Sequence, residues 1–229
     1  IAWTIFPSLI GEVVRTRMYY QVSQIKKGED PFANLLAPMM AYSMIAAIFY
    51  LLFYWWADLV VNSFMPTYLE SVDTTKILMI ALVPLGVMKI CSDYLYGNMQ
   101  KKTFFVICAW TCGSVMQAGL LFFLNLTKNQ ILFAAPIAYL STTFLVYCLI
   151  AGEAFEIRRH FKKALKRMSQ LVFPVISATI IVLFVKEYFH ISPGQDIKTN
   201  LIFFLLSATI LCFSVLLFIS DRRRLELKI

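Results

Sequence analysis

The stretch Val87-Met88-Lys89-Ile90-Cys91-Ser92-Asp93-Tyr94 places a lysine and an aspartate one helical turn apart inside an apolar segment. Charges within a membrane are costly unless they are paired or hydrated, and they tend to face a bundle interior or an aqueous cavity. The apolar residues around this pair therefore predict the fold, and the pair itself is a candidate for function.

The composition of the whole chain is typical of a membrane protein. Of its 229 residues, 60% are hydrophobic and 15% are charged, and the mean hydropathy is +0.73. A soluble domain carries roughly 25% charged residues. Apolar runs close to the roughly 20 residues that a helix needs to cross a bilayer recur along the chain. These features predict an all-α, polytopic transmembrane helical bundle.

Six complete spans are expected, and a truncated span precedes them at Ile1–Gly11. Turn-forming and charged residues separate the spans, which we place at Pro38–Asn62, Ile77–Tyr96, Thr103–Leu124, Ile131–Ala151, Leu171–Tyr188 and Leu201–Ser220. Pro84 and Gly86 interrupt the second span. Because the first apolar run is too short to cross a membrane, we expect the chain to be the C-terminal part of a longer protein whose N-terminal half is missing here.

A basic amphipathic segment follows the fourth span. Between residues 155 and 170, apolar residues recur at helical spacing, and the opposite face carries Arg158, Arg159, Lys162, Lys163, Lys166 and Arg167. Such a helix is expected to lie in the plane of the membrane surface and to bind anionic lipids. It divides the chain into three parts: a lobe of one truncated and four complete spans at 1–154, the amphipathic helix at 155–170, and two further spans with a basic tail at 171–229.

The distribution of lysine and arginine predicts the topology. If successive loops lie on alternating sides, one side holds 16 of the 21 cations, the other holds four, and Lys89 is the remaining one. Short loops rich in Lys and Arg stay in the cytoplasm. The basic loops and the C-terminus are therefore expected to be cytoplasmic.

The sequence contains no recognisable motif for catalysis or metal binding. The two histidines, His160 and His190, form no metal-ligand pattern with Cys, Asp or Glu. No Gly-rich phosphate loop occurs, and no basic cluster is interleaved with aromatic residues as nucleic-acid binding would require. We therefore expect no catalytic residues, no metal, no cofactor and no nucleic-acid partner, and hence a protein that is not an enzyme.

Lys89 and Asp93 are the first candidates for substrate binding. They share a helix face, so they are placed to pair with each other. Lys89 lies roughly 12 Å from the turn at Gly97, so its side chain either extends towards the membrane surface or is held in a cavity. In a cavity, its ammonium group would suit a phosphate group.

The second set of candidates is Glu12, Arg15 and Arg17, where the truncated span meets the cytoplasm. These residues either form an ordinary interfacial set or attract an anionic headgroup. Two other polar residues within spans have simpler interpretations. Asp58 follows two tryptophans and is interpreted as hydrated near the outer surface, and Gln117 as a hydrogen-bonding residue between helices.

Three short segments resemble those of bacterial polysaccharide (Wzx-like) flippases, which belong to the multidrug/oligosaccharidyl-lipid/polysaccharide exporter superfamily. They are Phe6-Pro7-Ser8-Leu9, Phe64-Met65-Pro66-Thr67-Tyr68-Leu69, and Leu95-Tyr96-Gly97-Asn98-Met99-Gln100-Lys101-Lys102. The resemblance extends over nearly the whole chain, as the C-terminal half of a fourteen-span protein. The chain departs from the family at Ile131, where it keeps small residues in place of a Gly-rich motif.

The resemblance implies a two-lobed bundle in the bacterial cytoplasmic membrane, with a central cavity that opens alternately to each side. The cargo would be a polyprenyl-diphosphate-linked oligosaccharide destined for surface polysaccharide such as O-antigen. By position, Glu12, Arg15 and Arg17 would line the cavity, whereas Lys89 would lie in the body of the lobe.

Three other functions are compatible with parts of the sequence. A drug/cation antiporter of the same superfamily would favour acidic cavity residues. A membrane-embedded glycan polymerase or ligase would usually carry a large polar outer loop, and the outer loops expected here are short. A structural membrane scaffold would make no use of the charges within spans.

Overall fold

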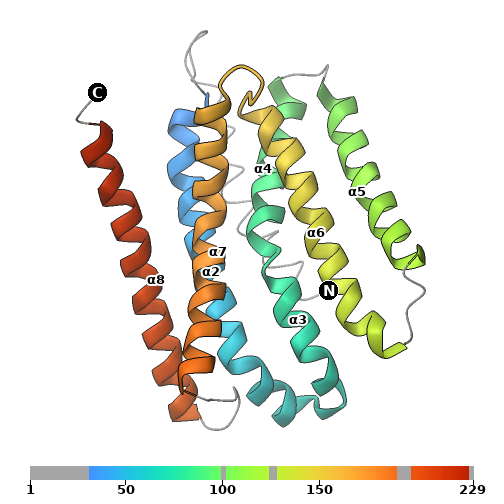
Figure 1. Cartoon of the computed structure of the whole chain (residues 1–229), viewed down its shortest axis with the longest axis vertical. Coiled ribbons are helices and arrows are strands. Elements are labelled where there is room, and N and C mark those ends of the chain that lie inside the picture. The colour runs from blue at the N-terminus through green and yellow to red at the C-terminus, as the bar shows by residue number, and fades with distance from the viewer. Residues whose placement is uncertain (1–30, 99–101, 124–127, 190–196, 227–229) are drawn as a thin grey trace. The chain divides into compact units, whose positions relative to one another are not determined.

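The computed structural model describes residues 31–98, 102–123, 128–189 and 197–226, and these residues form helices and short connections without any β-strand (Figure 1). The helices are α2 (Pro31–Phe64), η1 (Pro66–Ser71, a 3-10 helix), α3 (Val72–Met79), α4 (Leu82–Asn98), α5 (Thr103–Phe123), α6 (Lys128–Ala154), α7 (Phe161–Phe189) and α8 (Ile197–Glu226). The predicted helical bundle is confirmed. The truncated span expected at Ile1–Gly11 lies outside the described residues.

Five helices in the described part of the chain are long and apolar enough to cross a membrane. They are α2, α5, α6, α7 and α8, and α3 with α4 would form a sixth span if the two cross together. These helices correspond to the six complete spans expected from the sequence. The protein is therefore a multi-pass helical membrane protein.

The break in the second span lies before Pro84, not at it. Residues Ile80 and Ala81 separate α3 from α4, and the Ala81 backbone N–H donates to the Leu78 carbonyl in a tight turn. Pro84 has no N–H to donate to the carbonyl four residues earlier, which belongs to Ile80. Proline is tolerated in the first turn of a helix, where the N–H would be unsatisfied in any case, so α4 begins at Leu82.

The described residues form two compact units, of which the first comprises 31–43 and 77–172. Within it, α6 lies between α4 and α5, and successive helices run in opposite directions (Figure 1). Tyr42 of α2 lies against Gly86 of α4 and donates its hydroxyl to the Leu82 carbonyl at 3.0 Å. Tyr147 of α6 donates to the Met168 carbonyl of α7 at 2.8 Å. Two buried tyrosines thus join their helices to neighbouring backbones.

The second unit comprises 44–76 and 173–226 among the described residues. Phe203 of α8 stacks on Trp55 of α2, with ring centroids 5.5 Å apart, and it also contacts Phe189 of α7 at 5.3 Å. Aromatic pairs at such separations add to the stabilisation that burial provides. Phe203 therefore connects three helices of this unit.

The basic segment expected at 155–170 is helical only from Phe161, and it is not the separate helix that the sequence analysis expected. Residues 155–159 form turns, and a single helix, α7, runs from Phe161 to Phe189 and joins the rest of the basic segment to the fifth span. Ala164, Met168 and Arg167 are buried on these first turns, whereas Phe161 and Leu165 are exposed. These first turns belong to the first unit, where the Tyr147 hydroxyl of α6 bonds to the Met168 carbonyl.

The end of α6 has an uncommon residue at its cap. Ile157 N–H donates to the Gly152 carbonyl at 2.8 Å and Glu156 N–H to the Glu153 carbonyl at 3.3 Å, a pattern that defines a Schellman cap. The residue after such a cap adopts a left-handed conformation and is usually glycine. Here it is Glu156, with φ 54°. A non-glycine residue in this region costs about 1–2 kcal/mol.

Gly86→Ala is expected to destabilise the protein. The added methyl group would overlap the ring of Tyr42, and overpacking of this kind costs about 1–3 kcal/mol. Thermal unfolding of the protein in detergent measures the loss. Gly119 of α5 is a matched control because a Cβ there meets no heavy atom within 4 Å. Gly119→Ala should keep or raise the melting temperature, and equal melting of the two variants would contradict the Tyr42–Gly86 contact.

Candidate functional site

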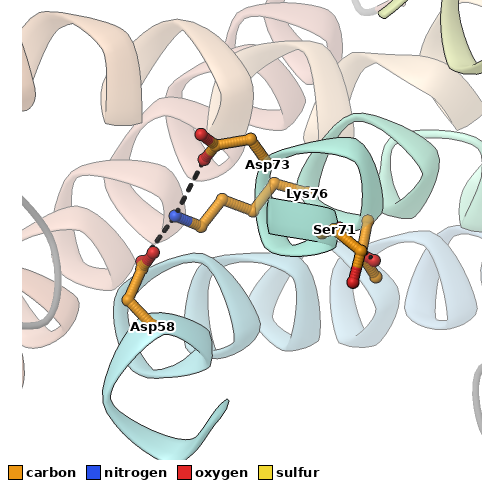
Figure 2. A network of polar contacts seen from close by, with 5 residues as sticks. Asp58, Ser71, Asp73 and Lys76 are labelled. Atoms are coloured by element: carbon orange, nitrogen blue, oxygen red, sulfur yellow. Dashed lines mark hydrogen bonds and ion pairs between the residues drawn. The ribbon is translucent and has the colours of Figure 1, made fainter. Parts of the chain in front are cut away.

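A buried lysine lies between two aspartates in the second unit (Figure 2). Lys76 Nζ of α3 lies 2.5 Å from Asp58 Oδ2 of α2 and 3.4 Å from Asp73 Oδ1 one turn away on its own helix. The Lys76 side chain is 7% exposed, against 25% for Asp58 and 75% for Asp73. Asp58 is therefore the counter-ion that makes burial of Lys76 possible, and Asp73 is a weak second partner.

The aromatic ring of Tyr54 completes the surroundings of Lys76. Tyr54 lies one turn before Asp58 on α2, and Lys76 Nζ is 5.0 Å from its ring centroid. A cation at this distance from an aromatic face is attracted by the negative face of the ring. One stripe of α2 thus supplies a carboxylate and an aromatic face to the same cation. The sequence analysis did not predict this cluster.

Lys89 and Asp93, predicted as substrate-binding residues, are both half-buried on α4 in the first unit. Both take part in interactions, so neither is an isolated charge in the span. They lie four residues apart on one helix, as the sequence analysis expected. The other predicted site residues, Glu12, Arg15 and Arg17, lie outside the described residues.

A groove with polar lining lies between α5 and α6, near the middle of both candidate spans. The two helices approach closely at Gly113 of α5, because Val146 of α6 occupies the space that a side chain at residue 113 would need. The groove encloses about 80 Å³ and is lined by Trp110, Gly113, Ser114, Gln117, Tyr139, Thr142, Thr143 and Val146. A water molecule needs roughly 10–15 Å³ of such volume, so there is room for several waters.

Most of the hydroxyl groups in this groove are satisfied by their own helices. Ser114 donates to the Trp110 carbonyl at 3.1 Å, and Thr142 donates to the Ala138 carbonyl at 2.9 Å. Gln117 differs, because no described residue hydrogen-bonds its side-chain amide. An amide without a partner is costly in an apolar environment. Gln117 is therefore the polar group of the groove that most needs water, substrate or another protein segment.

Metal-binding geometry is absent from the described residues, where no group of three or more His, Cys, Asp or Glu could hold an ion. Comparison with known proteins gives no identification, since no family model, curated protein or solved structure matches this chain. The class of protein is therefore given by the structure itself. It is a multi-pass helical membrane protein, and its described residues include the buried pair of Lys76 and Asp58 and the polar groove between α5 and α6.

Asp58→Asn is expected to lower the free energy of unfolding by about 2 kcal/mol, because it leaves a buried lysine without its principal counter-ion. Asp73→Asn is the matched control, and its effect should be below about 1 kcal/mol because Asp73 is exposed and farther away. Thermal unfolding in detergent compares the two.

A double variant separates loss of the pair from loss of fold. Asp58→Asn combined with Lys76→Met removes both charges, so it should recover most of the stability. Equal destabilisation by Asp58→Asn and Asp73→Asn, or no recovery in the double variant, would contradict the assigned roles.

Proposed function

We propose that this protein is a flippase that moves a lipid-linked oligosaccharide across the bacterial cytoplasmic membrane for surface polysaccharide synthesis. The observation that carries the proposal is the groove between α5 and α6, where neutral hydrogen-bonding groups and aromatic rings lie in the middle of two spans. The resemblance of three short segments to polysaccharide flippases supports the same function.

The lining of the groove suits sugar better than a charged solute. Sugar hydroxyls need donors and acceptors without net charge, which Gln117, Thr143 and Tyr139 carry. The Trp110 and Tyr139 rings offer flat apolar surfaces with a polar edge. At about 80 Å³, however, the groove is far below the 300–1,000 Å³ of typical ligand pockets. It would thus form one wall of the transport cavity.

The diphosphate of the cargo requires cations elsewhere in the cavity. Arg15, Arg17 and Lys89 are the proposed phosphate-binding residues, with Glu12 and Asp93 as the carboxylates that balance them. Polyvalent phosphate is recognised well by guanidinium and ammonium groups. The sugar end and the phosphate end of the cargo would thus be bound by different residues.

A cation antiporter of the same superfamily is the second candidate, and Asp58 is the observation that bears on it. An antiporter needs a carboxylate within a span that exchanges protons or cations. Asp58 lies within α2 but is already neutralised by Lys76. A cation would have to displace the lysine before it could bind. This cluster therefore favours the flippase over the antiporter.

Gln117→Leu is expected to reduce glycan export about tenfold, because it removes a side chain that would hydrogen-bond the sugar. The assay is complementation of a flippase-deficient strain by the complete gene, with surface glycan measured at matched protein levels. Thr111→Val is the matched control, because Thr111 also lies on α5 but outside the groove, and its hydroxyl bonds the Ile107 carbonyl.

Export at the wild-type rate by Gln117→Leu would remove the groove from the mechanism. In the same strain, Arg15→Ala and Lys89→Ala test the phosphate-binding residues, and each should slow export. If the wild-type gene restores export in none of several strains, each lacking the flippase for a different glycan, the proposed flippase function is contradicted.

The proposed topology places the basic connection between α6 and α7 in the cytoplasm and the η1 connection outside. It is tested with single cysteines at Lys163 and Tyr68, both exposed, in a protein whose five cysteines have been replaced. A membrane-impermeant maleimide should label Tyr68→Cys in intact spheroplasts and Lys163→Cys only after lysis. The reverse pattern would invert the topology.

A further inference from the structure

The connection between α6 and α7 borders a charged pocket of about 360 Å³ in the first unit. Its lining consists of Lys102 just before α5, Glu153 at the end of α6, and Glu156, Arg158 and Arg159 in the connection. The volume falls within the range of small-molecule sites. Three cations and two carboxylates leave this lining with one net positive charge.

Each carboxylate of the pocket holds one cation. Glu153 Oε1 lies 2.7 Å from Lys102 Nζ, and Glu156 Oε2 lies 3.6 Å from Arg159 Nη1. The second pair is exposed and long, so it is easily broken. Within the described part of the chain, no carboxylate forms an ion pair with Arg158. The pocket thus offers two guanidinium groups to an incoming anion.

The backbone of Glu156 indicates that its side chain has a function. Glycine would fit the left-handed conformation at this cap without strain, but it would remove the carboxylate that faces Arg159. Strained residues that persist in a fold often mark functional sites. The strain at Glu156 is therefore explained if its carboxylate occupies Arg159 until an anion replaces it.

The surroundings of the pocket indicate the kind of anion. The first turns of α7 carry Lys162, Lys163 and Lys166, together with the exposed apolar side chains of Phe161 and Leu165. Exposed apolar groups beside cations at the end of a span suit an amphiphile whose phosphate lies at the membrane surface. Guanidinium groups bind phosphate through paired hydrogen bonds.

We infer that this pocket binds the phosphate headgroup of an anionic phospholipid, with Arg158 and Arg159 as its ligands. The Glu156 carboxylate is the group that the phosphate displaces from Arg159. The site is independent of the proposed cargo, because a resident lipid would occupy it whatever the protein transports.

The test titrates short-chain phosphatidylglycerol into the complete protein in neutral detergent and follows the melting temperature, which rises when a ligand binds the folded state. Arg158→Gln with Arg159→Gln should lower the apparent affinity about tenfold, since charged hydrogen bonds are lost. Lys162→Gln with Lys163→Gln removes the same charge from the neighbouring turn outside the pocket lining, and it should change the affinity less than about twofold. If the two double variants lose affinity equally, the lipid binds a diffuse basic surface, and the assignment of the pocket is overturned.

Two variants of Glu156 test whether its carboxylate competes with the phosphate for Arg159. Glu156→Gln removes the competing charge and should raise the affinity about threefold. Glu156→Gly should do the same and also raise the melting temperature of the lipid-free protein by about 2–4 °C, because it relieves the strained conformation. Unchanged or weaker lipid binding by both variants would overturn the inference that the phosphate displaces the Glu156 carboxylate from Arg159.

Two further ligands identify the source of the phosphate. Short-chain phosphatidylcholine should give no comparable shift, because its headgroup has no net charge. Inorganic phosphate should be at least about tenfold weaker than phosphatidylglycerol, because it lacks the acyl chains that Phe161 and Leu165 would contact. An equal shift with inorganic phosphate would overturn the lipid assignment.

Discussion

A segment that crosses a membrane must satisfy its own backbone hydrogen bonds, and the structure depends on this constraint. It explains why the described residues are helical and why many hydroxyl side chains inside the spans bond back to their own helices. Hydroxyl groups donate to the carbonyl four residues earlier at Ser43, Thr111, Ser114, Ser141, Thr142, Thr179, Thr209 and Ser214. It also explains the break at Ile80 and Ala81, where Pro84 removes a donor and the chain forms a turn.

The same constraint separates the polar groups that stabilise the fold from those that remain available for function. Many hydroxyl groups find an acceptor one turn away, although the buried hydroxyls of Ser92 and Ser207 do not. The amide of Gln117, which lines the groove, also finds no partner among the described residues. A charge needs a counter-charge, and Asp58 supplies it for Lys76. The ion pair is therefore mainly structural, whereas Gln117 is a group whose partner must come from outside these residues. This difference is the reason for placing the substrate wall at α5 and α6.

The sequence was sufficient to predict the helical bundle and the five helices that are long enough to cross a membrane, because long apolar runs have few alternatives there. It did not predict that the basic residues from Phe161 onward would share one helix, α7, with the fifth span, since hydrophobic periodicity is the same for a helix in the membrane plane and for the end of a span. It also missed the pair of Asp58 and Lys76. The sequence did contain a signal for this pair. Asp58 lies eight positions before Pro66 and Lys76 ten positions after it, and residues at similar distances from a short connection face each other when the two helices pack together. The groove could not be predicted, because it depends on which faces of α5 and α6 meet.

The positions of glycine in this chain help to explain why Glu156 has a left-handed backbone conformation at the cap of α6. The structure has glycine at two positions where helices approach closely, Gly86 against Tyr42 and Gly113 against Val146. At the cap of α6 it has Glu156, although glycine is the usual residue there. Both backbone hydrogen bonds of the motif are present, from Ile157 N–H to the Gly152 carbonyl and from Glu156 N–H to the Glu153 carbonyl. A cap that keeps both hydrogen bonds of the motif but replaces its glycine by a charged residue is best explained by the charge, which here faces Arg159 in the pocket lining.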